Sequence, residues 1–384
     1  MADLLLPTSQ RGVETYRLNA TPEVGAHGAW NRTAYAAAHV VADPFAEIDP
    51  WLQAAVDWDK TLAFREHLWS QGFGVAEAMD TAQRGMGLDW ATSLELIQRS
   101  TKDARAGGHL IASGAGTDHL EFTSDTTVDD VIAAYEMQCE AVEATGSRVI
   151  LMASRALCAV AKGPEDYARV YQTVLSGLQQ PAILHWLGEM FDPALAGYWG
   201  NADHVAAMDN CLDVLNANAD NIDGIKISLL SAEKEISMRR RLPAGVVMYT
   251  GDDFNYPELI KGDEQGYSHA LLGIFDPIAG AAGRALGALA AGDEAGYHAA
   301  FDPTVPLSRH IFRAPTRFYK TGVVFMAYLN GHQDHFTMIG GQESTRSTLH
   351  LADIVRLAND ARLFTDPEQA AARARAVFAT RGIS

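Results

Sequence analysis

Asp223-Gly224-Ile225-Lys226-Ile227-Ser228 is the stretch that decides the fold and first points to chemistry. It reads as a short strand that carries one lysine among apolar neighbours. Lysine is almost never fully buried unless it is paired or has a function. We therefore expect a partly desolvated amine at residue 226, held on a strand.

Seven further short apolar or β-branched runs accompany this strand, and helical patterns separate most of them. In one such pattern, residues 128–144, apolar side chains repeat at helical spacing, with acidic residues in the first turn and Gly146 just past the end. Eight strands, each followed by a helix, predict a parallel α/β sheet closed into a (β/α)8 TIM barrel. The eight strands are expected at 35–42, 74–79, 109–113, 148–153, 182–186, 224–227, 246–250 and 268–272.

Three regions follow from this pattern. Residues 33–290 form the predicted barrel, which holds the active site. Residues 1–32 precede it as an N-terminal extension that covers either the barrel bottom or a neighbour. Residues 291–384 contain no strand pattern and predict a C-terminal helical extension, with helices at 323–329, 349–363 and 367–380.

Composition narrows the classes of partner. The 384 residues carry 30 Lys and Arg against 48 Asp and Glu, a formal net charge of −18. Nucleic acids and anionic membrane surfaces need clustered cations, so neither is expected as a partner. The three cysteines are widely spaced and form no CxxC pair, which fits a reducing cytoplasm. With no signal-peptide pattern and no membrane-spanning apolar run, we expect a cytoplasmic protein that acts on a small molecule.

The mouth of such a barrel, where the strands end, is the expected site. Loss of hydration there lowers the pKa of Lys226. A fall from about 10.4 to near 7 corresponds to roughly 4.6 kcal/mol against the ammonium form. The resulting free amine can attack a carbonyl and form a Schiff base. The alternative is a lysine paired with an acid of the mouth. The candidate substrate-binding residues at or near the strand ends are Asp80, Thr81, Gln83, Asp118, Arg155, Glu189, Asp252, Asp253 and His269.

Gly224-Ile225-Lys226 resembles the GIK strand of the dihydrodipicolinate synthase and N-acetylneuraminate lyase superfamily, in which that lysine forms the Schiff base. The resemblance continues in order along residues 33–330. It implies a class I aldolase or lyase that works through an imine on Lys226 without a cofactor, assembled as a dimer or tetramer. The other similar stretches are 42–45 (ADPF, the family's TPF), 79–83 (its GTTGE), 111–116 (its IAGVG-type strand), 182–186 (AILHW, its iiLYN) and 250–253 (TGDD, its SGDD).

Departures from the family pattern bear on the substrate. Asp80-Thr81-Ala82-Gln83 stands where the family's loop binds a carboxylate, and Asp80 would repel a carboxylate unless a cation intervened. A hydroxylated ketone such as a keto-sugar derivative is therefore expected ahead of a small keto acid. His185 occupies the position of the family's proton-shuttling tyrosine and is either a general acid and base or a core histidine. Arg155 either binds an acidic group of the substrate or pairs with Glu189 or Asp118.

Two other classes of function stay open. A metal-dependent TIM-barrel sugar isomerase or epimerase would use the histidines and carboxylates of the mouth, although none has a tight ligand spacing such as HxH. A non-catalytic sensor built on the same scaffold would bind a ligand without turnover.

Two other stretches have alternative interpretations. Asp252 and Asp253 either orient substrate hydroxyls or cap the next helix. His332-Gln333-Asp334-His335 reads as an exposed loop between helices. The remaining candidate metal ligands are Asp118, His119, Glu121, His185, Glu189, Asp252 and His269.

Overall fold

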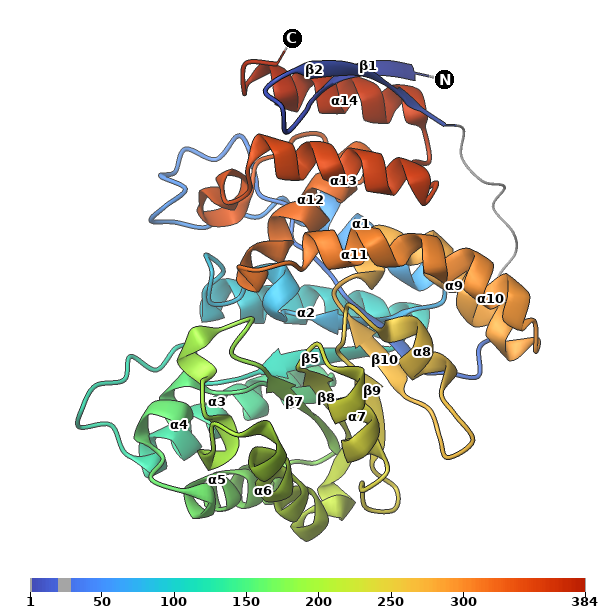
Figure 1. The fold of residues 1–384 in the computed structure, drawn as a ribbon. Helices are drawn as coiled ribbons and strands as arrows, with labels where there is room; N and C mark the ends of the chain where they lie inside the picture. Colours follow the sequence, from blue (N-terminus) through green and yellow to red (C-terminus); the bar gives the residue numbers. More distant parts are fainter. Residues whose placement is uncertain (1, 20–28, 384) are drawn as a thin grey trace.

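Eight parallel strands close into a barrel in the order β10-β3-β4-β5-β6-β7-β8-β9 (Figure 1). The computed structural model describes residues 2–19 and 29–383. Each strand overlaps one of the eight predicted runs, so the predicted barrel is confirmed. The barrel strands are β3 (Ala34–Ala37), β4 (Gly74–Glu77), β5 (Ile111–Ala115), β6 (Arg148–Leu151), β7 (Ala182–Leu187), β8 (Ile222–Ser228), β9 (Val247–Thr250) and β10 (His269–Leu272).

Helices cover the outside of the barrel, and local sequence signals set their ends. The third helix begins after Thr127, whose side chain forms a capping box with Asp130, and ends at Gly146 in the left-handed conformation. The helices that follow the strands are α1 (Trp58–Ser70), α2 (Trp90–Gly107), α3 (Val128–Thr145), α4 (Arg155–Val160), α5 (Pro164–Gly177), α6 (His204–Ala217), α7 (Ala232–Arg239), α8 (Tyr256–Lys261) and α9 (Phe275–Ala290).

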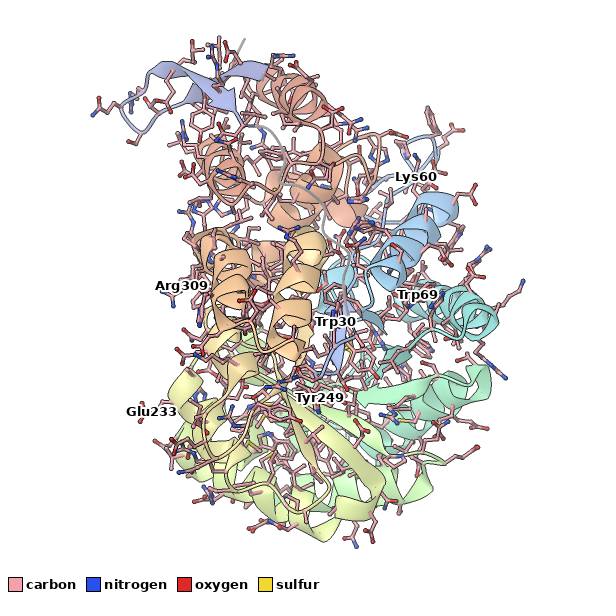
Figure 2. The ribbon with its side chains drawn as sticks, turned by 90° about the vertical axis from the view of Figure 1, so that its right-hand side faces the viewer. Trp30, Lys60, Trp69, Glu233, Tyr249 and Arg309 are labelled. Carbon is pink, nitrogen blue, oxygen red and sulfur yellow. The ribbon has the colours of Figure 1, made fainter. Side chains whose placement is uncertain are left out.

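Alternate strand residues fill the barrel interior. Tyr249 meets Tyr35 edge to face inside it, with ring centroids 6.0 Å apart, and the Tyr249 hydroxyl donates to Asp223 at the start of β8 (Figure 2). Side chains on a strand alternate between its two faces. Because Ile225 and Ile227 pack with the outer core, the residues between and beside them point inward. Lys226 is therefore an interior residue by the geometry of its strand.

The C-terminal region is helical, as predicted, and its helices stack above the barrel mouth (Figure 1). It also carries the N-terminal hairpin, in which β1 (Ala2–Pro7) pairs antiparallel with β2 (Val13–Leu18). The hairpin packs on the last helices, because Arg356 donates to the Pro7 carbonyl and Arg375 to the Asp3 carbonyl, each at 2.8 Å. Residues 20–28 of the predicted extension lie outside the described residues. The helices of this region are α10 (Glu294–Phe301), α11 (Val305–Ile311), α12 (Tyr319–Leu329), α13 (Thr348–Asp360) and α14 (Pro367–Ala379).

The hairpin therefore does not cover the bottom of the barrel, which was one of the two expectations for residues 1–32. Alternating residues of β1, including Leu4 and Leu6, are buried against the C-terminal helices. Their burial, at 2% and 0% exposure, anchors the start of the chain to its end. None of the helices in the described part of the chain combines the length and apolar character needed to cross a bilayer.

Candidate active site

Lys226 and His185 are direct neighbours across the β7–β8 pair, in register with each other. Lys226 is 7% exposed and His185 is 1% exposed. Burial lowers the pKa of Lys226, against the opposing effect of Asp253 and Asp80. Burial, with the nearby Lys226 charge, lowers the pKa of His185 well below its ordinary value. The site thus holds a desolvated amine beside a neutral imidazole.

The imidazole is fixed at one nitrogen and free at the other. Its Nε2 lies 3.2 Å from the Ser228 hydroxyl oxygen, two residues beyond Lys226 on β8. Its Nδ1 is buried and has no hydrogen-bond partner among the described residues. A buried imidazole nitrogen without a partner is a group that substrate can satisfy.

Gly251 leaves the room that the lysine needs. A Cβ at this position would come within 2.8 Å of Lys226 Cε and 2.4 Å of the Ser228 hydroxyl oxygen. Any larger residue at the end of β9 would therefore push the lysine side chain out of place. Close packing against Lys226 therefore explains why the TGDD stretch has a glycine at residue 251.

The two aspartates after Gly251 have different surroundings. Asp252 organises the turn before α8, since its Oδ1 accepts from the backbone N–H of Phe254 and Asn255 at 2.8 and 3.1 Å. Asp253 is fully buried, accepts from the Ile274 N–H at 2.9 Å and interacts electrostatically with Lys226. Burial raises the pKa of Asp253 to about 7. Neither aspartate caps α8, because its N-cap position is Asn255 and it has no side-chain cap hydrogen bond; Asp252 instead stabilises the turn before the helix, and Asp253 lies within electrostatic range of Lys226.

A cavity of about 670 Å³ opens above the strand ends from β4 to β7, with His185 and Asp80 in its wall. Two ion pairs shape its rim. Arg84 holds Asp118 through two nitrogens, at 2.6 and 2.9 Å, and Arg155 Nε holds Asp192 at 2.5 Å. Asp118 and Arg155 are therefore at the cavity, but neither is paired as the sequence suggested. The guanidinium tip of Arg155 lies beside Gly85, and its two terminal nitrogens have no hydrogen-bond partner in the described part of the chain.

Sequence reasoning missed two residues that come from the C-terminal region. Tyr319, at the start of α12, shares a hydrogen bond of 2.8 Å with the Thr81 hydroxyl. Lys320 is 5% exposed, and its ammonium lies 3.2 Å from both the Met86 sulfur and the Arg317 carbonyl and 4.8 Å from the centroid of the Tyr319 ring. Burial lowers the pKa of Lys320 to about 8, with Asp80 as the strongest opposing charge. Lys320 is a cation near Asp80, which is the condition under which a carboxylate would not be repelled there.

The wall of this cavity does not include Lys226, Thr81, Asp252 or Asp253, and three further candidate residues make their contacts elsewhere. Gln83 is buried and donates from Nε2 to the Ile339 carbonyl at 2.7 Å, so it ties the loop after β4 to the C-terminal region. Glu189 turns away to His204, with 3.1 Å between Oε2 and Nε2. His269 is the first residue of β10 and accepts from the Thr33 N–H at 3.0 Å, at the opposite end of the barrel. It leaves the candidate set because the first residue of a barrel strand lies at the end opposite the mouth, and the predicted strand 268–272 already placed it near that end.

The histidines and carboxylates that were candidate metal ligands are also not gathered at one place among the described residues. Within residues 2–19 and 29–383, no group of three or more His, Cys, Asp or Glu side chains is arranged to hold a metal ion. His332, expected in an exposed loop, is instead half-buried beside His67, with ring centroids 4.5 Å apart. Asp334, from the same stretch, is exposed and pairs with Lys60 at 2.8 Å.

The sequence from residue 4 to residue 383 matches the model of a family described as protein of unknown function, DUF993. The chain belongs to the DUF993 family. No curated relative matches the sequence.

Solved structures similar to this DUF993 chain carry dihydrodipicolinate synthase names. The protein YagE from E. coli K12, described as a prophage protein of the dihydrodipicolinic acid synthase family in complex with pyruvate, has a TM-score of 0.64 at 14% identity, covering 87% of this chain and 100% of its own. The dihydrodipicolinate synthase of Acinetobacter baumannii has a TM-score of 0.61 at 15% identity, covering 87% and 99%. The enzyme of Oceanobacillus iheyensis has 0.61 at 15%, covering 85% and 96%. At this identity the likeness shows the fold, and it agrees with the resemblance seen in the sequence.

Proposed function

We propose that this chain is a Schiff-base-forming lyase of the aldolase type, acting on a small hydroxylated ketone through an imine on Lys226. The observation that carries the proposal is the pairing of a desolvated Lys226 amine with a neutral His185 on adjacent strands at the barrel mouth. Desolvation favours the free amine, which is the nucleophilic form.

Lys226 and His185 have separate roles in the proposed reaction. The Lys226 amine adds to the ketone carbon, the resulting carbinolamine loses water, and a protonated imine forms. Cleavage of the neighbouring C–C bond sends its electron pair into the imine and leaves an enamine. A hydroxyl on the departing fragment must lose its proton at that moment, and His185 is placed to accept it through its free Nδ1. The same proton returns to the enamine carbon, and water releases the ketone product.

The charges around the cavity suggest the substrate class. Asp80 accepts hydrogen bonds well and suits the hydroxyls of a keto-sugar derivative. Lys320 offsets the charge of Asp80, and the free nitrogens of Arg155 offer a fork for a carboxylate or a phosphate. We therefore place the ketone at Lys226, hydroxyls near Asp80, and an acidic group toward Arg155.

An assembly of two or four chains, which the family resemblance implied, stays a prediction for this protein. Analytical ultracentrifugation of the purified chain tests it directly. A single species at 41.5 kDa would contradict it.

Borohydride trapping tests the proposed function. Wild type and Lys226→Met are incubated with dihydroxyacetone, dihydroxyacetone phosphate and pyruvate, reduced, and weighed by intact mass spectrometry. We expect a reduced adduct on wild type with at least one of the two hydroxylated ketones, and none on the variant. Lys102→Met, an exposed lysine on α2, is the control that keeps the adduct. Failure of all three ketones, together with loss of catalytic activity in EDTA, would replace the lyase by the metal-dependent isomerase.

A further inference from the structure

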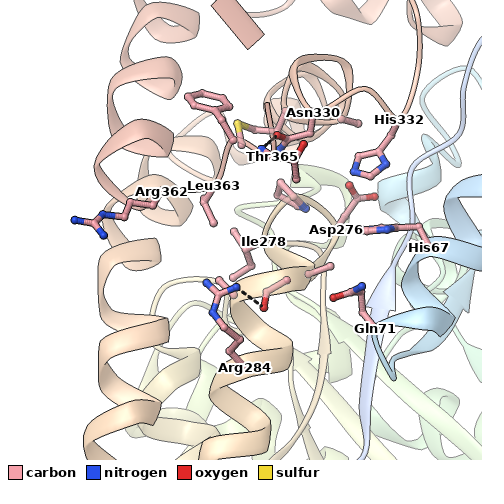
Figure 3. A pocket seen from close by; sticks show the side chains of 17 residues that line it. His67, Gln71, Asp276, Ile278, Arg284, Asn330, His332, Arg362, Leu363 and Thr365 are labelled. Atoms are coloured by element: carbon pink, nitrogen blue, oxygen red, sulfur yellow. Dashed lines mark hydrogen bonds between the residues drawn. The ribbon is translucent and has the colours of Figure 1, made fainter. Parts of the chain in front are cut away.

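A second cavity, of about 200 Å³, lies among α1, α9 and the C-terminal helices (Figure 3). Its wall comes from α1, the first turns of α9, the end of α12 and the segment after α13. None of the residues assigned above to the reaction lines it. It therefore needs its own explanation.

One end of this cavity holds a buried acceptor. Asp276 is 3% exposed, and its Oδ2 accepts from the His39 N–H at 2.8 Å and contacts His39 Nδ1 at 2.7 Å. Its Oδ1 is buried with no hydrogen-bond partner among the described residues. A buried carboxylate oxygen without a partner is destabilising unless something donates to it.

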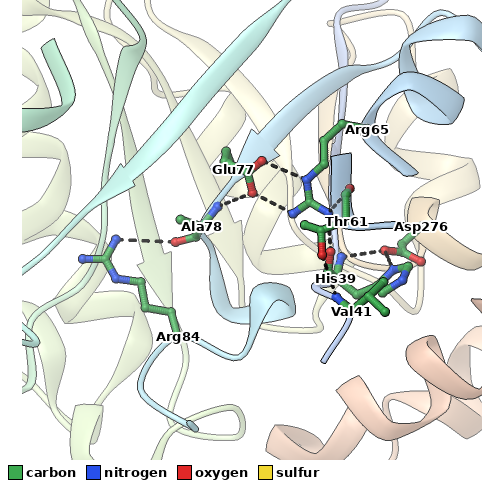
Figure 4. Close-up of polar contacts among 8 residues, drawn as sticks. All are labelled: His39, Val41, Thr61, Arg65, Glu77, Ala78, Arg84 and Asp276. Carbon is green, nitrogen blue, oxygen red and sulfur yellow. Dashed lines mark hydrogen bonds and ion pairs between the residues drawn. The ribbon is translucent and has the colours of Figure 1, made fainter. Parts of the chain in front are cut away.

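The acceptor is held rigidly in this orientation. The His39 carbonyl accepts from Arg65, which pairs with Glu77 at 2.8 Å, and both of those side chains are fully buried (Figure 4). This chain of hydrogen bonds ties Asp276 to the ends of β3 and β4. The carboxylate cannot turn away from the cavity without breaking these hydrogen bonds, so its Oδ1 is preorganised for a donor.

The other end of the cavity holds an unpaired cation. Arg284 is half-buried on α9 and donates to the Gly280 carbonyl at 3.2 Å. No carboxylate in residues 2–19 or 29–383 lies within ion-pair distance of it. A guanidinium offers five N–H donors in a planar fork that matches a carboxylate. This end is therefore suited to an organic acid.

Both apolar and polar side chains line the wall between these ends, and the polar ones include His67, Gln71, Asn330 and His332. Ile278, Met326 and Leu363 lie between the two polar groups, and Figure 3 shows Ile278 between Asp276 and Arg284. Asp276 and Arg284 are eight residues apart in α9, which would be about 12 Å of axial rise in a straight helix, but the helix is kinked at Ile278 between them. The Arg284 side chain leans back toward the helix start, where it donates to the Gly280 carbonyl. We therefore choose ligands with a chain of about six carbons to test whether one molecule reaches both groups.

We propose that this cavity binds a compact organic acid, with its carboxylate on Arg284, its hydrocarbon chain on Ile278 and Met326, and a hydroxyl donating to Asp276 Oδ1. The small volume excludes nucleotides and sugars with several rings. The proposal does not depend on the imine chemistry of Lys226, because the two cavities share no wall residue.

Calorimetric titration with four six-carbon probes tests the assignment: 6-hydroxyhexanoate, hexanoate, 1,6-hexanediol and 1-hexanol. We expect 6-hydroxyhexanoate to bind about tenfold tighter than 1,6-hexanediol, because only the acid engages Arg284. Arg284→Gln should abolish that difference, while Arg99→Gln, an exposed arginine on α2, should keep it. Asp276→Asn should reduce the advantage of 6-hydroxyhexanoate over hexanoate.

A second measurement, made on wild type, tests the proposal even if Asp276→Asn fails to fold. In wild type with ¹³C-labelled methionine methyl groups, the Met326 resonance, assigned with Met326→Leu, should move on addition of 6-hydroxyhexanoate. Binding that survives unchanged in Arg284→Gln would overturn the proposal. So would a Met326 resonance that stays still, or equal affinity for the acid and the diol.

Discussion

Lys226 and His185 occupy partnered positions on β8 and β7, and both point into the barrel mouth. Neither has a carboxylate at ion-pair distance among the described residues. The charge of one therefore acts on the other, and the pKa of His185 is lowered partly by Lys226. In the proposed mechanism the lysine therefore acts as the nucleophile and the histidine as the proton acceptor.

The pH dependence of imine formation follows from the lowered pKa of Lys226. Since only the free amine attacks, the trapping rate rises with pH and reaches half its maximum below the ordinary lysine value of about 10.5. Asp253 raises the pKa of Lys226, so Asp253→Asn should move the midpoint to still lower pH. Asp209→Asn, an exposed residue on α6, should leave it in place. A midpoint at the ordinary lysine value in wild type would contradict the desolvated amine.

Lys320 should decide how well the site tolerates an acidic group. Lys320→Met removes the cation near Asp80, so capture of dihydroxyacetone phosphate should fall by about 10-fold to 100-fold. Capture of uncharged dihydroxyacetone should change far less. The comparison is made by trapping rates at equal ketone concentration. An equal loss for both ketones would show that Lys320 acts only through the fold.

The buried ion pair of Arg65 and Glu77 should be central to stability. Both side chains are fully buried, and the pair links α1 to the end of β4. Arg65→Met would leave Glu77 as an unpaired buried charge and should lower the free energy of unfolding by about 3–5 kcal/mol. The exposed pair of Arg99 and Glu95 provides the contrast, since Arg99→Met should lower it by less than about 0.5 kcal/mol. Urea denaturation monitored by circular dichroism measures both.

Glu235 should make stability fall with rising pH. It is fully buried between the Ser268 and Thr250 hydroxyls, and burial raises its pKa to about 8. Because the folded-state pKa lies above the unfolded one, its contribution is complete below about pH 4.5 and is lost as the pH rises through about 8. Glu235→Gln stays neutral, so it should gain stability relative to wild type between pH 5 and pH 9. A constant difference across that range would contradict the raised pKa.

The sequence predicted the barrel because each strand is a short apolar run with its own turn and helix signals, and parallel pairing leaves little choice of topology. It also identified Lys226, since a lysine inside an apolar strand is a local anomaly. His269 was wrongly included, because both the predicted strand 268–272 and the observed β10 place it at the beginning of the strand, away from the mouth. The pairing of Arg155 with Asp192 was missed because Asp192 lies in the loop after β7, beyond the strand ends that were read as the site.

Tyr319 and Lys320 could not be predicted as site residues. They lie more than ninety positions beyond Lys226 in a region that reads only as helices, and nothing local marks α12 as the element above the mouth. Their placement depends on how the C-terminal helices stack on the barrel, which is a long-range packing outcome. The half-buried position of His332 also results from this long-range packing, which the polar sequence of its loop does not reveal.

The position of the trapped ketone tests the central claim most directly, because Lys226 and Lys320 are both buried lysines with lowered pKa values near Asp80. Wild type is reduced with borohydride in the presence of dihydroxyacetone phosphate and of dihydroxyacetone, digested, and mapped by peptide mass spectrometry. We expect the reduced adduct on the peptide that contains Lys226, and an unmodified peptide containing Lys320. An adduct on Lys320 with Lys226 unmodified would contradict it.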